Sequence, residues 1–189
     1  MPRETDGDIK IFNAAAPQEG DDLDALAAMT EQLRAEGTLE RAKRLARELA
    51  KLSVQSPELL EMAESFGFTP EKAREQQLHV LMVFSGQSAL SALLKPQLLA
   101  DAAITSMNNA LILHAKDFWD TISDGGVFTQ YRLALRNQDT PEKQAAEIGE
   151  VFARLCGQED NPELCALGGA VFLSARRLIA AKWAQGEGG

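Results

Sequence analysis

The chain has 189 residues, of which 45% are hydrophobic and 25% are charged. This composition is typical of a folded, soluble protein, and the length suffices for one domain, or two small ones, with a substantial core. A formal net charge of −9 argues against general nucleic-acid binding, because an acidic chain repels phosphate backbones.

The sequence also predicts a location. No apolar stretch follows a basic N-terminus, so we predict no secretory signal. The longest uncharged run, residues 76–94, contains several polar side chains, and we expect it to be core rather than a membrane span. Two cysteines are too few for a disulfide framework, which favours the reducing cytoplasm.

Composition predicts an all-α fold, because alanine, leucine, glutamate and basic residues dominate while β-branched and aromatic residues are sparse. Residues 1–20 show little periodicity, and we predict a mobile tail. The helical domain is expected to span residues 21–184 as a bundle of seven or eight helices. Residues 185–189 are expected to be a frayed end.

The first predicted helix, 21–36, begins with acidic residues and ends at Gly37. The next, 38–53, carries an apolar stripe of period 3.6, and Thr38 is its expected cap. Four short strings of the same kind then predict further helix starts, because a polar residue accepts a backbone hydrogen bond and proline follows it at the first helical position. These strings begin at Ser56, Thr69, Thr140 and Asn161.

The helix from Pro70 to Phe84 and the long helix after Pro96 are expected to form the buried centre. Between residues 78 and 115, only two residues carry full charge. A shorter amphipathic helix is predicted at 127–137. The last helix pair is predicted at 140–156 and 162–184.

The tetrapeptide Thr-Pro-Glu-Lys occurs at 69–72 and again at 140–143, which raises the question of an internal duplication. The two stretches also share Gly-Gln at the expected helix exit, at Gly86 and Gly157. Capping chemistry explains Thr-Pro-Glu but not the later matches. Two hypotheses stay open, a duplicated αα-hairpin and the chance self-similarity of an alanine- and leucine-rich helical chain.

The two histidines are the candidates for a catalytic residue. His79 lies four residues after Glu75, and His114 lies three before Asp117. A histidine–carboxylate pair can act as a general base, but a buried, hydrogen-bonded histidine is commoner, so we assign no catalytic residue. Metal-binding motifs are absent from the sequence, so no metal or other cofactor is predicted.

Polar side chains at helical spacing interrupt the apolar helix after Pro96, so they share one face. This face is either exposed to solvent or the lining of an internal pocket. The face comprises Gln97, Asp101, Thr105 and Asn108. In the pocket hypothesis, the polar contacts of a small, mostly apolar ligand are His79, Asp101, Asn108 and His114.

The only basic run lies in the helix at 38–53, where two glutamates interleave it and no aromatic residue occurs. It is either a solvated face with internal ion pairs or a docking surface for an acidic partner or RNA. The candidate docking residues are Arg41, Arg44, Arg47 and Lys51.

Gly168 and Gly169 fall inside a predicted helix at a cost of ~1 kcal/mol each, which predicts a close helix–helix approach. No basic cluster flanks Cys156 or Cys165 to lower the pKa of its thiol, and we expect both to be small buried hydrophobic residues.

The sequence leaves two function classes open. The first is a non-enzymatic interaction or regulatory module with a protein partner or self-association. The second is a helical bundle that binds, or acts on, a small apolar ligand. Neither nucleic-acid binding nor a membrane span is expected.

Overall fold

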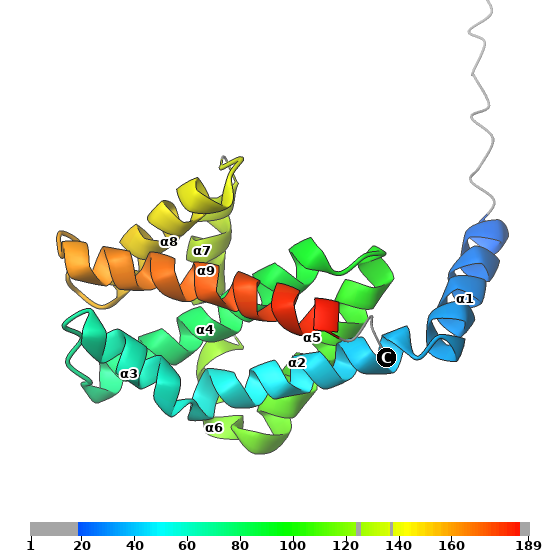
Figure 1. Cartoon of the computed structure of the whole chain (residues 1–189), viewed down its shortest axis with the longest axis horizontal. Helices are drawn as coiled ribbons and strands as arrows, with labels where there is room; N and C mark the ends of the chain where they lie inside the picture. Colours follow the sequence, from blue (N-terminus) through cyan, green and yellow to red (C-terminus); the bar gives the residue numbers. More distant parts are fainter. Residues whose placement is uncertain (1–18, 124–125, 137, 186–189) are drawn as a thin grey trace, which may run out of the picture.

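The computed structural model describes residues 19–123, 126–136 and 138–185, and every regular element within these ranges is an α-helix. The helices are α1 (Glu19–Ala35), α2 (Thr38–Gln55), α3 (Pro57–Ser65), α4 (Lys72–Leu93), α5 (Gln97–His114), α6 (Lys116–Ile122), α7 (Gly126–Leu135), α8 (Pro141–Leu155) and α9 (Pro162–Gln185) (Figure 1). The all-α prediction is confirmed for this part of the chain.

The helix count differs from prediction, because the described residues hold nine helices rather than seven or eight. The long helix predicted after Pro96 ends at His114. Ala115, with φ −146° and ψ 51°, separates α5 from the short α6. Residues 1–18 of the predicted tail and residues 186–189 of the predicted frayed end lie outside the described ranges, and α1 begins at Glu19.

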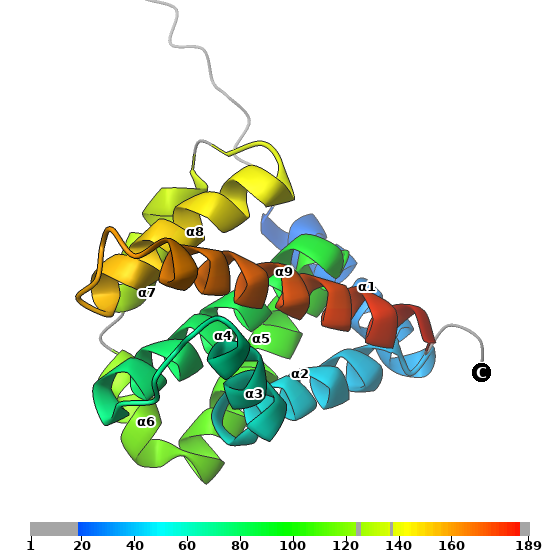
Figure 2. The same cartoon turned by 60° about the vertical axis from the view of Figure 1, so that its left-hand side comes forward.

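Helix α4 crosses the middle of the fold and packs against α2, α5, α8 and α9 (Figures 1 and 2). It is buried on several sides between Leu78 and Leu90, as expected for a core helix. It begins at Lys72 rather than Pro70, and it continues past Phe84 to Leu93. Helix α5 buries one face only, and α9 joins α4 as the second major core helix with eight buried residues.

Local capping chemistry sets three of the predicted helix starts. Ser56 Oγ accepts a hydrogen bond from Leu59 N at 3.2 Å, and Thr140 Oγ1 accepts one from Lys143 N at 3.3 Å. Asn161 Oδ1 accepts two, from the backbone nitrogens at the start of α9. The prediction that Thr38 caps α2 is wrong, because Thr38 lies inside the helix and Gly37 occupies the cap position.

The first Thr-Pro-Glu-Lys copy does not cap a helix. Phe68 is 4% exposed and is therefore held in the core just before the motif. Thr69 and Pro70 lie outside any helix, and α4 begins only at Lys72, after Glu71 in an extended conformation. The same four letters thus form different backbones in the two places.

The matching glycines also differ. Helix α4 passes unbroken through Gly86, whereas Gly157, at φ 72°, ends α8 in the left-handed conformation that glycine adopts without steric cost. The N–H of Gly157 donates to Arg154 O at 2.9 Å and the N–H of Gln158 donates to Ala153 O at 2.9 Å. The duplication is therefore not confirmed.

Helices α8 and α9 pack antiparallel at very short range. A Cβ added at Gly168 would lie 2.9 Å from Gly149 Cα, and one added at Gly169 would lie 2.9 Å from Ala145 O. Both glycines are buried. The close approach predicted for Gly168 and Gly169 is confirmed, and Gly149 is its counterpart on α8.

Helix α1 lies beyond the N-terminal end of α2 (Figure 1) and packs mainly against α2. Leu33 is buried and belongs to the hydrophobic core. Leu23, Leu26 and Met29 are 66%, 47% and 40% exposed. The helix therefore carries an apolar strip that the described residues leave uncovered.

Candidate functional site

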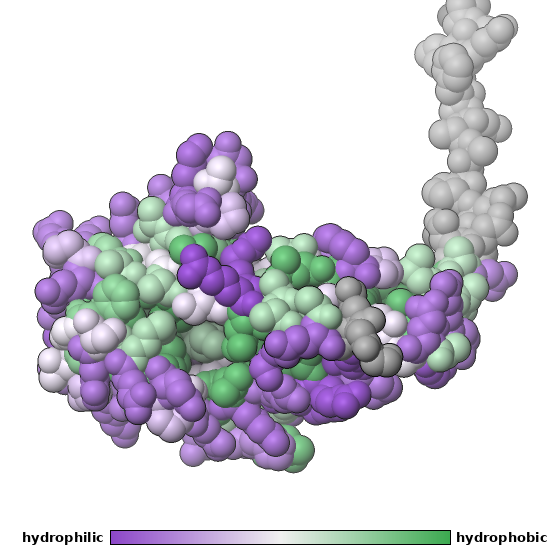
Figure 3. All heavy atoms as spheres, in the orientation of Figure 1, coloured by the Kyte–Doolittle hydropathy of each residue, from purple (hydrophilic) through white to green (hydrophobic). Residues whose placement is uncertain are grey.

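An apolar groove lies between α9 and the successive helices α2 and α3. At one end the walls touch: Lys182 Nζ lies 2.9 Å from Glu48 Oε2, and the Arg41 guanidinium lies 3.8 Å from the centre of the Trp183 ring. Toward α3 the walls separate, and a groove of about 330 Å³ opens. Hydrophobic surface lies between these helices on the face drawn in Figure 3.

The groove is lined mainly by apolar side chains from four helices. Its walls come from α2, α3 and α9, and Met82 comes from α4. On α9 the lining positions are spaced by three and four residues, so they share one face of the helix. Methionine side chains are flexible and adapt to the shape of a partner. The apolar lining comprises Leu52, Leu59, Met62, Met82, Val171 and Leu178.

One edge of the groove is acidic. Glu58 lines the groove, and Glu61 and Glu64 are exposed further along α3. Ser56 Oγ donates a hydrogen bond to Glu58 Oε2 at 2.7 Å, and this bond holds the pKa of Glu58 below its ordinary value. The α3 edge is therefore negatively charged at neutral pH.

The predicted ligand-binding residues lie apart from this groove. His79 is half-buried on α4, where Nδ1 lies 2.8 Å from Ser53 O and Nε2 lies 3.7 Å from Glu75 Oε1. His114 is exposed at the end of α5. His79 therefore has the partners expected of a structural histidine, including the predicted contact with Glu75.

The polar face of α5 is largely exposed. Asp101 is exposed and accepts a hydrogen bond from Gln97 Nε2 at 2.8 Å. Asn108 is half-buried and accepts one from Gln87 Nε2 at 2.8 Å. Neither residue lines the apolar groove. For most of this face, the structure agrees with solvent exposure rather than an internal pocket.

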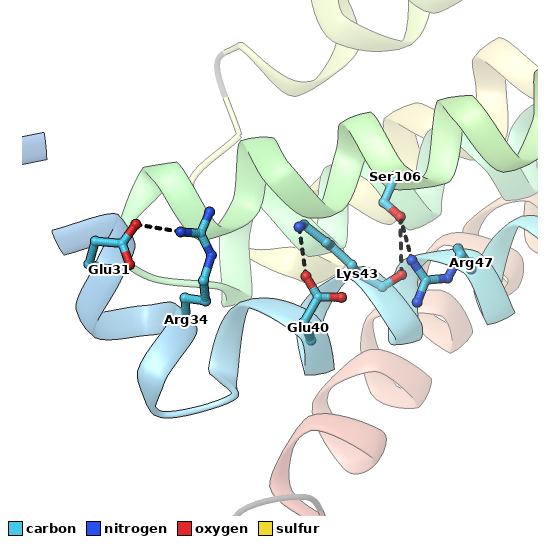
Figure 4. A network of polar contacts seen from close by, with 6 residues as sticks. All are labelled: Glu31, Arg34, Glu40, Lys43, Arg47 and Ser106. Atoms are coloured by element: carbon cyan, nitrogen blue, oxygen red, sulfur yellow. Dashed lines mark hydrogen bonds and ion pairs between the residues drawn. The ribbon is translucent and has the colours of Figure 1, made fainter. Parts of the chain in front are cut away.

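Two residues of the predicted basic surface contact other helices of the fold. Arg41 packs on Trp183, a cation–π contact that ties α2 to α9. Arg47 Nη1 lies 3.5 Å from Ser106 Oγ of α5, as Figure 4 shows. Arg44, Arg47 and Lys51 are all exposed. Docking of a partner on this face stays a prediction.

Ion pairs within and beside this face agree with the other hypothesis for the basic run, a solvated helix face with internal ion pairs. Lys43 Nζ donates to Glu40 Oε1 at 2.8 Å (Figure 4), and this bond is the main cause that lowers the pKa of Glu40. A further pair joins Arg34 and Glu31 on α1. Exposed pairs of this kind contribute little to the stability of the fold, which is what we expect of a solvated surface.

The thiols show no sign of activation. Both cysteines are free and partly buried. Burial raises the pKa of Cys156 to about 11 and also raises that of Cys165. Among the described residues, no group of three or more histidine, cysteine, aspartate or glutamate side chains could hold a metal ion.

Helix α9 has the length and hydropathy of a membrane span, with 44% of its most apolar window buried inside the fold. Core helices of soluble proteins share these properties, so they are weak evidence for a span. The buried face of α9 packs against α8 and α4, as in a core helix.

The sequence did not identify the groove residues. Leu52 belongs to the apolar stripe predicted at 38–53, which is typical of ordinary core, and Leu178 lies far from it along the chain, in the helix predicted at 162–184. No spacing pattern indicates that these two helices separate at one end. Comparison with family models, with curated proteins and with solved structures found no match to this chain.

Proposed function

We propose that the protein is a non-enzymatic interaction module whose groove binds an amphipathic helix of a partner protein. The supporting observation is the apolar groove itself, bounded by helices and open to solvent. Helical partners place leucine-type side chains at i, i+3, i+4 and i+7 into such grooves. The cytoplasm is the proposed location.

Charge favours a partner helix with basic flanks. Glu58 and Glu61 lie on the α3 edge, and the whole chain carries a net charge of −9. Complementary charge speeds association and suppresses wrong partners. The exposed apolar strip of α1 from a second copy is a poor occupant, because Asp24 and Glu31 on α1 would repel the acidic edge.

A small apolar ligand in the same groove is the alternative. A volume of about 330 Å³ lies at the low end of ligand pockets, which span roughly 300–1,000 Å³. This alternative keeps the groove but needs no charge on the ligand, so charge dependence separates the two functions.

The test uses a fluorescent peptide with leucines at helical spacing and lysines on both flanks. Ser174 is exposed on the α9 wall, so Ser174→Trp should fill the groove without disturbing the core. We expect saturable binding that Ser174→Trp weakens about tenfold or more. Ser123→Trp, an exposed serine outside the groove lining, is the matched control and should bind like wild type.

A second peptide with glutamate in place of lysine should bind more weakly than the basic one. Equal binding of both peptides would contradict the charge argument. Equal loss with both tryptophan variants, or no saturable binding of the basic peptide, would contradict the groove as the binding site.

A further inference from the structure

A second cleft, of about 420 Å³, lies where α4, α5, α7, α8 and α9 meet. Its lining includes Arg132 from α7 and Arg176 from α9, and no carboxylate occurs among the described residues that line it. The chain as a whole carries a net charge of −9, so a cleft whose described lining has two arginines and no acidic residue differs in charge from the rest of the protein. It shares no lining residue with the apolar groove.

Neither arginine has a carboxylate partner among the described residues. The Arg176 guanidinium lies 5.9 Å from the centre of the Phe172 ring, a distant cation–π contact. Some other cations of the chain are paired, such as Lys143 with Asp139 at 2.8 Å. Arg132 and Arg176 are therefore available to an anion. A guanidinium group can donate two parallel hydrogen bonds to the oxygens of one carboxylate or phosphate.

The remaining polar lining groups are neutral hydrogen-bonding residues. Gln87 is held by Asn108 Oδ1 at 2.8 Å, and Gln144 Nε2 donates to Gln138 O at 3.1 Å. These bonds orient the two amides. Each NH₂ group has a second hydrogen for a ligand.

The cleft also has an apolar part. Phe84 is buried, and Ile104 and Leu135 are half-buried in its lining. A simple inorganic anion would leave this surface uncovered, whereas an anion attached to a hydrocarbon body would cover it. The lining thus matches a ligand with one charged end.

We propose that this cleft binds a small amphiphilic anion, with its carboxylate or phosphate head at Arg132 and Arg176 and its hydrocarbon body over Phe84, Ile104 and Leu135. Both head groups share the chemistry that guanidinium recognises. This site is separate from the partner-binding groove, so either proposal can fail without the other.

Isothermal titration with octanoate, octyl phosphate and octan-1-ol tests the proposal. At least one of the two anions should bind saturably, and octan-1-ol should bind about tenfold more weakly or not at all. Arg132→Gln and Arg176→Gln should each weaken binding of that anion about tenfold or more.

Arg136→Gln and Arg177→Gln are the matched controls, because both arginines are exposed and outside the lining. They should change affinity less than about twofold, on the scale of exposed charge contacts. The proposal is overturned if neither anion binds, if octan-1-ol binds equally well, or if the control variants lose as much affinity as the cleft variants. Thermal unfolding of each variant confirms that it is folded.

Discussion

Alanine at Gly149 should destabilise the fold strongly, because this glycine sits where α8 and α9 touch. An added Cβ would lie 2.1 Å from the backbone oxygen of Cys165 and 2.9 Å from its carbonyl carbon. Ordinary contacts of a Cβ are 3.4 Å or longer, so the added atom is more than 1 Å too close. A backbone atom cannot rotate away, and the two helices must separate.

The expected loss in the free energy of unfolding is the difference between two opposing effects. Alanine favours the helix by about 1 kcal/mol over glycine. Overpacking typically costs about 1–3 kcal/mol and more where nothing flexible can yield. We therefore expect a net loss of about 2 kcal/mol, which lowers the melting temperature of a chain of this size by ~4–8 °C.

Gly86→Ala is the matched control, since Gly86 is also a buried glycine inside a helix. Its added Cβ would lie 3.2 Å from Met107 Cε, the flexible end of a side chain. We expect no loss, or a gain of up to ~1 kcal/mol. Both melting temperatures are measured by circular dichroism. If Gly149→Ala is as stable as Gly86→Ala, the close packing of α8 on α9 is refuted.

Three further substitutions test local features by urea unfolding. Thr140→Ala should cost about 1 kcal/mol because its hydroxyl caps α8, whereas Thr69→Ala should stay within about 0.5 kcal/mol; equal losses would contradict the difference in capping. Asp101→Leu should also change stability by less than about 0.5 kcal/mol because the side chain is exposed, and a large loss would indicate a buried carboxylate. Tyr131→Phe should leave stability equal or higher at neutral pH, because among the described residues the buried hydroxyl has no hydrogen-bond partner. Burial raises the pKa of Tyr131 in the fold, so the unfolded chain loses this proton first. Above pH ~10, where tyrosine ionises when unfolded, the wild type should lose stability that Tyr131→Phe keeps; parallel pH profiles would contradict the burial of the hydroxyl.

Local chemistry in the sequence predicted helices well where nothing distant competed with it. Ser56, Thr140 and Asn161 cap helices because each side chain needs only a backbone N–H two or three residues further on. The prediction that Thr69 caps a helix is wrong, because Phe68, the residue just before it, is held in the core. A tertiary contact of this kind leaves no local sequence signal.

Pairing between helices was predictable only in part. The adjacent glycines 168 and 169 indicated a close approach, since their cost inside a helix needs a packing reason. Their counterpart Gly149 was not predicted, because the sequence does not say which face of α8 meets α9. The arginines of the second cleft, Arg132 and Arg176, likewise come from different helices with no shared motif.

Methyl NMR on methionine tests the groove proposal most directly, because the chain has five methionines and two of them line the groove. The lysine-flanked amphipathic peptide should shift the methyl signals of Met62 and Met82 along one saturation curve. The signals of Met107, which is buried in the core, and Met29, which lies on α1, should stay in place. Unchanged Met62 and Met82 signals, or a saturable shift of Met29 alone, would contradict the groove as the partner-binding surface.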